Sequence, residues 1–118
     1  MTKEMIAYVT EQTRALLAAP SCCAEARAAG EAWLAAAGTA AEPAETKKYL
    51  AELAEDITPI DGLIAFAGSP AAAAHMGEAA AKGLLAHAQQ IKAAGAQYCD
   101  CPACTAARAI LAKKAELL

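Results

Sequence analysis

The chain has 118 residues, a formal net charge of −3 and a hydrophobic content of 58%. This length predicts a single domain over residues 1–118 with enough apolar material for a core. The acidic balance and the lack of any lysine–arginine run argue against nucleic acid as a partner. No apolar stretch reaches the roughly 20 residues of a membrane span, and the first residues lack a signal-peptide core. We therefore expect no membrane association and a cytoplasmic location.

Composition also predicts the fold class. Roughly a third of the residues are alanine, the strongest helix former, and Trp33, Phe66 and three tyrosines are the only aromatic residues. Such a chain packs helices closely through small side chains and leaves little material for a sheet. We predict an all-α protein: a compact helical bundle of about five to seven helical segments, joined by short loops, with neighbouring helices roughly antiparallel.

The first helix is predicted over residues 2–19, where apolar side chains recur at helical spacing and Thr2 is placed to cap the N-terminus. Pro20 ends this helix. Ser21 is the predicted cap of a second helix that extends to Gly38, so the cysteines that follow Ser21 fall in its first turn.

Proline and glycine mark the remaining helices. Pro43, Pro59, Pro70 and Pro102 each suit a first helical position, with Thr58 and Ser69 as caps before two of them. The predicted helices cover residues 43–57, 59–67, 70–76, 78–94 and 102–114, with Gly77 or Gly83 as a break before or within the fourth of these.

Cysteines carry the most distinctive chemistry in the sequence. Five are present, at Cys22, Cys23, Cys99, Cys101 and Cys104. In a reducing compartment an odd number indicates metal ligands or redox thiols rather than a disulfide framework. The CxxC spacing of Cys101 and Cys104 lets two thiolates reach one ion from a single helical turn.

A second pair of ligands is expected from the other cysteine group. Both groups adjoin a proline at a predicted helix N-terminus, where unpaired N–H groups favour thiolate over thiol. If the two helices begin at the same end of the bundle, four of the five sulfurs can form a tetrahedral set. Cys101, Cys104 and Cys22 are the firmest choices, and either Cys99 or Cys23 supplies the fourth ligand, because adjacent residues in a helix project about 100° apart.

Zinc is the metal that this composition favours, since a closed set of thiolates without redox activity suits a small structural protein. Soft thiolates also bind Cu(I) and iron–sulfur clusters, so these remain alternatives. Cysteine is often simply a buried small hydrophobe, and that interpretation stands beside metal binding.

Other constellations give no catalytic site. His75 and His87 belong to no HExxH or ExxH motif, and neither a phosphate-binding loop nor a nucleophile elbow occurs. Acidic residues crowd the end of the third predicted helix and the start of the fourth, a pattern typical of a solvated face. They are Glu52, Glu55, Asp56 and Asp61.

Three segments carry a resemblance, at residues 19–26, 60–67 and 98–104. They resemble a family of small bacterial cysteine-containing all-α proteins of unknown function, some of which bear a label as heat-shock chaperones of the ninety-kilodalton type. Nothing in the sequence matches that chaperone's longer α/β ATP-binding domain or its glycine-rich segments. The resemblance implies only that both cysteine segments belong to a shared pattern.

Three functions remain open at this point. The first is a helical protein with a cysteine-ligated zinc between the N-termini of two helices. The second is a thiol–disulfide redox or sensor protein, in which Cys101 is the nucleophile and Cys104 or Cys22 resolves it. The third is a structural bundle that acts through self-association or through a protein partner.

Overall fold

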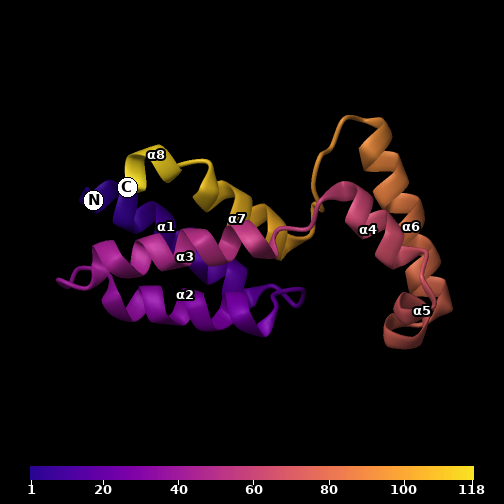
Figure 1. Ribbon diagram of the computed structural model, residues 1–118, viewed down its shortest axis with the longest axis horizontal. Helices are drawn as coiled ribbons and strands as arrows, with labels where there is room; N and C mark the ends of the chain where they lie inside the picture. The colour runs from indigo at the N-terminus through magenta and orange to yellow at the C-terminus, as the bar shows by residue number, and fades with distance from the viewer. The chain divides into compact units, whose positions relative to one another are not determined.

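The computed structural model describes residues 1–118 as eight α-helices without a β-strand (Figure 1). The all-α prediction is confirmed, and a short C-terminal turn brings the number of helices above the expected five to seven. The helices form two compact units: unit 1 contains residues 1–57 and 100–118, and unit 2 contains residues 58–99. A single domain over residues 1–118 stays a prediction, because two compact units can still unfold as one cooperative whole.

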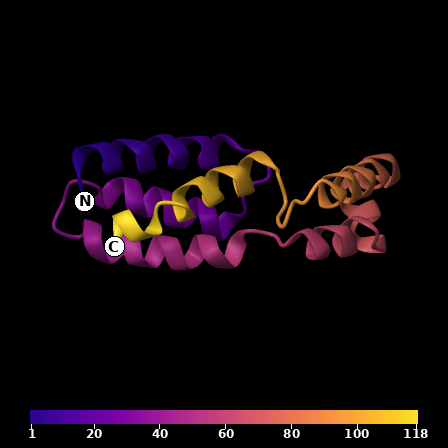
Figure 2. The same cartoon turned by 90° about the horizontal axis from the view of Figure 1, so that it is seen from above.

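Unit 1 is a four-helix bundle closed by a short terminal helix. Its members are α1 (Lys3–Ala18), α2 (Ala24–Ala36), α3 (Glu42–Asp56), α7 (Pro102–Leu111) and α8 (Lys114–Leu117). Helices α2 and α7 each pack against both α1 and α3. They run in the opposite direction to α1 and α3, so α2 and α7 begin at the end of unit 1 where α1 and α3 finish (Figures 1 and 2).

The core of unit 1 is built from the inward face of each helix. Its largest fully buried apolar side chains are Trp33, Tyr49, Leu16, Leu53, Ile110 and Val9. Alanines on α7 fill the spaces between them, which allows the backbones to approach closely. Within each helix these side chains recur at the helical spacing of the sequence.

Two hydrogen bonds pair polar side-chain groups that are buried in this core. Trp33 Nε1 donates to Thr46 Oγ1 at 2.9 Å, and the Thr13 and Tyr49 hydroxyls pair at 2.9 Å. Burial raises the pKa of Tyr49 to about 12, so its hydroxyl stays protonated at neutral pH. Both bonds are needed because an unpaired polar group in the core would cost stability.

Unit 2 is a smaller assembly of α4 (Ile60–Ala67), α5 (Pro70–Met76) and α6 (Glu78–Ala93). Helix α6 packs against both α4 and α5. The prediction of a break before α6 is correct at Gly77, whose φ of 92° suits glycine, whereas Gly83 lies inside α6. None of the helices in the structure is long and apolar enough to cross a membrane.

Helix caps both confirm and correct the sequence analysis. Thr2 caps α1 through the Met5 N–H, and Ser69 caps α5 through the Ala72 N–H. The predicted cap of α2 was wrong: the helix begins at Ala24 and Cys23 is its N-cap. Ser21 lies in the turn before the helix, because the chain makes a further hydrogen-bonded turn, Cys22 N–H to Ala19 O, after Pro20.

Candidate metal centre

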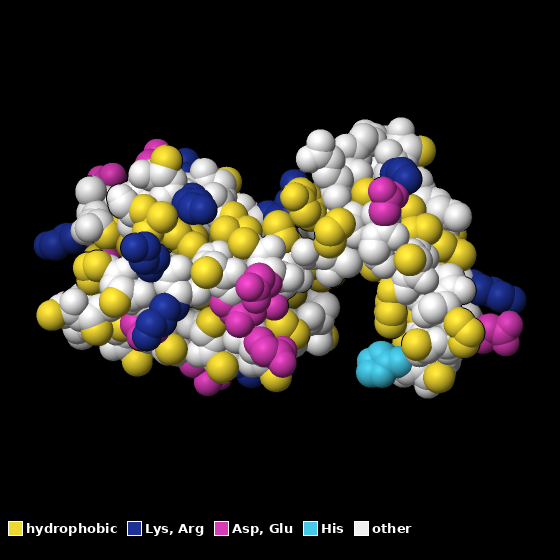
Figure 3. Space-filling view, in the orientation of Figure 1, with side chains coloured by type: hydrophobic (Ala, Val, Ile, Leu, Met, Phe, Trp, Pro, Cys, Tyr) yellow, Lys and Arg dark blue, Asp and Glu magenta, His cyan; other side chains and the backbone are white.

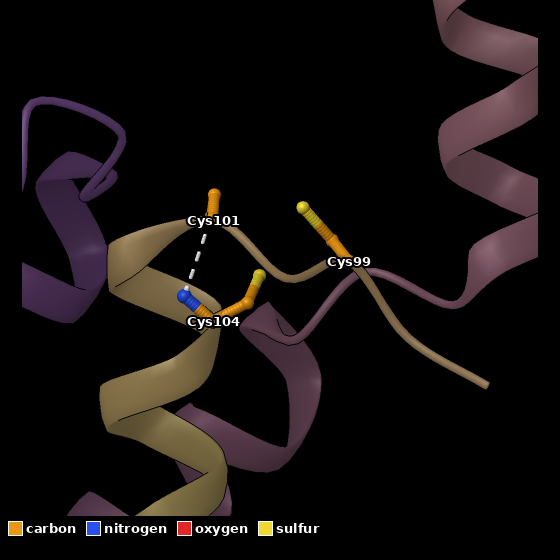
Figure 4. A group of neighbouring side chains, drawn as sticks. All are labelled: Cys99, Cys101 and Cys104. Atoms are coloured by element: carbon orange, nitrogen blue, oxygen red, sulfur yellow. Dashed lines mark hydrogen bonds between the residues drawn. The ribbon is translucent and has the colours of Figure 1, made fainter. Parts of the chain in front are cut away.

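Three thiols converge in the six-residue segment 99–104. The sulfur atoms of Cys99, Cys101 and Cys104 all lie within 4.8 Å of one another, which is close enough for the three side chains to hold a metal ion. Figure 4 shows Cys104 on the first turn of α7, Cys101 at the start of that helix and Cys99 on the extended segment before it. The Cys99 and Cys104 side chains point toward the same space.

Cys99 is placed by backbone pairing. Residues 97–99 run antiparallel to residues 58–60 through the Cys99 N–H to Thr58 O bond of 2.8 Å and the Ile60 N–H to Gln97 O bond of 2.9 Å. This short ladder holds residue 99 in an extended conformation, in which its side chain is 7% exposed.

Cys101 and Cys104 are placed by the start of α7. Pro102 occupies a first-turn position, as the sequence predicted, and Cys101 is the N-cap, with its Sγ accepting the Cys104 N–H at 3.3 Å. The Thr105 hydroxyl adds a bond to the Asp100 carbonyl at 3.1 Å. Because α7 is packed into the bundle, the CxxC pair is presented by a firmly held helix terminus.

The arrangement suits a soft cation. Cys99 and Cys104 are buried and Cys101 is half-buried. The protein around these side chains would therefore keep water away from most of an ion bound to them. The N–H bond to Cys101 Sγ stabilises negative charge on the sulfur, as thiolate ligation requires. Of the ligands that the sequence analysis proposed, these three are the ones that the structure brings into one group.

Cys22 and Cys23 lie outside this group. Both belong to the turn between α1 and α2, where Cys22 is half-buried against the core and Cys23 is exposed. Their helix does begin at the same end of unit 1 as α7, but α2 and α7 lie on opposite sides of α1 and α3 rather than side by side (Figure 1). Ligation by Cys22 or Cys23 therefore stays a prediction.

The expectation that a helix N-terminus favours thiolate was wrong for Cys22 and Cys23. The pKa of each thiol is raised from its ordinary value of 9.0, chiefly by desolvation. The Ala26 N–H opposes this effect at Cys23, and the positive charge of Arg27 opposes it at Cys22. The negative charge of Asp56 acts with desolvation at both thiols, so the helix terminus does not dominate.

Asp56 is a residue whose environment the sequence analysis missed. We expected a solvated acidic face, and Figure 3 does show acidic side chains gathered over the end of α3 and the start of α2. The Oδ2 atom of Asp56, however, is buried without a hydrogen-bond partner. Asp56 also hydrogen-bonds the Glu52 carboxyl group and raises its pKa. Its spacing of seven residues from Tyr49 was the available signal, because it places Asp56 on the buried face of α3.

Comparison with known proteins gives no assignment for this chain: no family model, curated protein or solved structure matches it. The resemblance to the small bacterial family stays a prediction. The geometry of the cysteine group is therefore the feature of this chain that points to a function.

Proposed function

We propose that the protein binds zinc in the cytoplasm through Cys99, Cys101 and Cys104 and uses the ion as a structural centre. The observation that carries the proposal is the convergence of three sulfur atoms within 4.8 Å. Three cysteines within six residues, two of them buried, are difficult to account for by apolar packing alone.

Zinc fits this group through its bond lengths and its redox inertness. With Zn–S bonds of about 2.3 Å, a tetrahedral ion holds its thiolates about 3.8 Å apart. The thiols therefore need to close in only slightly from their separations of up to 4.8 Å. Cu(I) and iron–sulfur clusters use the same ligand type and remain alternatives for the identity of the metal.

A structural role follows from the position of the ligands. An ion on Cys99, Cys101 and Cys104 closes the short loop that precedes α7 and holds its first turn. Metal binding to a folded site adds its binding free energy to the free energy of unfolding. No constellation of acid, base and nucleophile adjoins the group, so the proposal includes no catalytic step.

The test combines metal content with thermal stability. We expect freshly purified protein to contain about one equivalent of zinc and to lose it to a strong chelator. Its Tm should then fall by several degrees, because about 1 kcal/mol is worth roughly 4–8 °C in a domain of 60–100 residues. Cys104→Ser should contain no zinc. Without any chelator, its Tm should equal that of the chelator-treated wild-type protein. Cys23→Ser, which changes an exposed thiol outside the group, is the matched control. The proposal is ruled out if wild-type protein contains no metal as purified and binds no zinc when zinc is added.

A second candidate is thiol–disulfide exchange by Cys101 and Cys104, favoured by the N–H bond to Cys101 Sγ. In that reaction the Cys101 thiolate attacks a disulfide such as oxidised glutathione and displaces one glutathione thiolate. Cys104 then attacks the mixed disulfide and displaces the second, so that the protein pair is oxidised and the glutathione reduced. Rapid formation of a Cys101–Cys104 disulfide by zinc-free protein, measured by mass spectrometry, would favour this function.

A further inference from the structure

The three-cysteine group, which consists of Cys99, Cys101 and Cys104, offers a metal ion three ligand atoms, all of them sulfur. Histidine nitrogens and carboxylate oxygens also bind zinc, but the group contains none. Asp100 stands between two of the cysteines in the sequence, yet its side chain is exposed and its carboxylate lies outside the group. One six-residue segment of the chain therefore supplies three ligands and not four.

The remaining two cysteines do not complete this set. Cys22 and Cys23 lie in the turn before α2, and neither sulfur belongs to the group of neighbouring ligand atoms. Cys23 Sγ already accepts the Ala26 N–H at 3.4 Å as the N-cap of α2. The fourth ligand of a bound ion is therefore expected from outside the chain.

The coordination chemistry of zinc gives this count a consequence. Closed structural sites hold zinc with four protein ligands in a tetrahedron, whereas sites with three protein ligands place water or another small molecule in the fourth position. A zinc ion bound to the three-cysteine group belongs to the second kind. It can hold α7 at its first turn and still have one position that exchanges its ligand with solution.

Solvent reaches the group at Cys101. Cys99 and Cys104 are each 7% exposed, whereas Cys101 is half-buried. The residues on either side of Cys101, Asp100 and Pro102, are exposed. Because Cys101 is the N-cap of α7, a small molecule can approach an ion on this side while the helix stays folded.

We propose that a zinc ion on the three-cysteine group binds a small thiol from solution as its fourth ligand. This inference rests on the proposed metal centre and adds ligand binding to its structural role. Sulfur is the donor that matches a set of soft thiolates, and a thiol that coordinates zinc gives up its proton. In the exchange a Zn–S bond forms, the Zn–O bond to water breaks and the thiol proton passes to solvent. Nothing is oxidised or reduced.

Cobalt(II) in place of zinc tests the number of sulfur ligands. Reduced, metal-free protein is loaded with Co(II) in thiol-free buffer, and the sulfur-to-cobalt charge-transfer absorption is measured before and after addition of reduced glutathione. Because each bound thiolate contributes to this band, its intensity should rise by about one third as three sulfur ligands become four. S-methylglutathione, which lacks the thiol, is the control ligand and should cause no rise.

Two variants locate the sulfur ligands. Cys22→Ser should show the same rise as wild type, and Cys104→Ser should lose the band. A wild-type band that glutathione leaves unchanged overturns the inference. So does a band that has the intensity of four thiolates before glutathione is added, and a loss of about a quarter of it in Cys22→Ser would then identify Cys22 as the fourth ligand. Protein that binds no cobalt refutes the metal centre itself, and the inference falls with it.

Native mass spectrometry gives a second test on the unmodified chain. Zinc-loaded protein mixed with reduced glutathione should carry one zinc ion and one glutathione, and a chelator should remove both together. Glutathione that zinc-free protein holds equally well contradicts the proposal. An adduct that survives both chelation and denaturation is a mixed disulfide, and it contradicts the proposal as well.

Discussion

Two helices in this protein are capped by sulfur. Cys23 and Cys101 each accept an N–H from the third residue beyond them, a position that serine, threonine or aspartate usually occupies. Sulfur is a weak acceptor as a thiol and a good one as a thiolate. At Cys101, in the three-cysteine group, this capping bond also prepares the sulfur for a metal. Cys23 lies outside the group, and there the cap needs no metal to account for it.

The carboxylate of Asp56 is one of the groups that raise the pKa of the two thiols of the α1–α2 turn, after desolvation. Replacement by asparagine removes the negative charge that raises the pKa of Cys22 and Cys23, so both pKa values should fall. At a fixed pH below these values the thiolate fraction rises, and alkylation of both residues should be faster. The measurement is the pH dependence of iodoacetamide reaction. Glu55→Gln is the control because Glu55 is not among the groups that act on either thiol. Unchanged pH profiles in Asp56→Asn would show that the charge of Asp56 does not contribute to these pKa values.

The hydrogen bond between Trp33 and Thr46 offers a test of the core. Thr46→Val keeps the side-chain shape but leaves the buried Trp33 N–H without a partner, which should cost about 1–3 kcal/mol in the free energy of unfolding. Thr46→Ser keeps the hydroxyl and should cost less. Urea unfolding followed by Trp33 fluorescence measures both. A valine variant as stable as the serine variant would mean that the indole finds another acceptor.

At the scale of elements, helix spacing in unit 1 depends on small residues. Gly30 on α2 is buried, and a Cβ atom added there would lie 3.2 Å from Thr13 Cγ2 and 3.4 Å from Leu17 Cδ2 on α1. Thr13 is fully buried and β-branched, so its methyl group has little freedom to retreat. The close approach of α1 and α2 therefore depends on glycine at position 30.

Alanine at position 30 should therefore destabilise the protein, although alanine is ordinarily the better helix former by about 1 kcal/mol. Gly83 provides the matched control, because it lies within α6 with nothing inside 4 Å of an added Cβ atom. We expect Gly83→Ala to raise thermal stability and Gly30→Ala to lower it, as measured by circular dichroism melting. A rise in both variants would show that α1 and α2 can separate at little cost.

At the scale of the whole molecule, the two units differ in the size of their cores. Unit 1 fully buries a tryptophan, a tyrosine and several large aliphatic side chains, whereas Ile60 and Leu63 are the only large apolar side chains that unit 2 buries. A segment of this size gains little hydrophobic stabilisation to offset its chain entropy. Unit 2 should therefore be the first part of the chain to lose its structure.

Leu63→Ala tests this expectation. In urea, helix loss measured by far-UV circular dichroism should begin earlier in the variant, while the transition reported by Trp33 fluorescence, which belongs to unit 1, stays in place. Removal of a buried leucine typically costs about 2–5 kcal/mol. Ile110→Ala in unit 1 should instead move the fluorescence transition. If Leu63→Ala shifts both probes together, the chain unfolds as the single domain that its length predicted.

The sequence by itself determined the helical class, most helix boundaries and the inward-facing apolar residues. These follow from local causes: alanine propensity, proline and glycine positions, and the 3.6-residue period of side chains such as Leu16, Leu53 and Ile110. It also identified the CxxC of Cys101 and Cys104, because that spacing places two thiols on one helical turn.

Only the tertiary structure decided which cysteines meet. Cys99 joins the pair through backbone pairing with residues 58–60, far away in the chain, and no local pattern encodes that contact. The division into two units and the burial of the Asp56 Oδ2 atom are likewise decided by packing between helices. The pKa values of Cys22 and Cys23 depend on desolvation and on charges brought close by folding, so the local effect of a helix N-terminus was not sufficient to predict them.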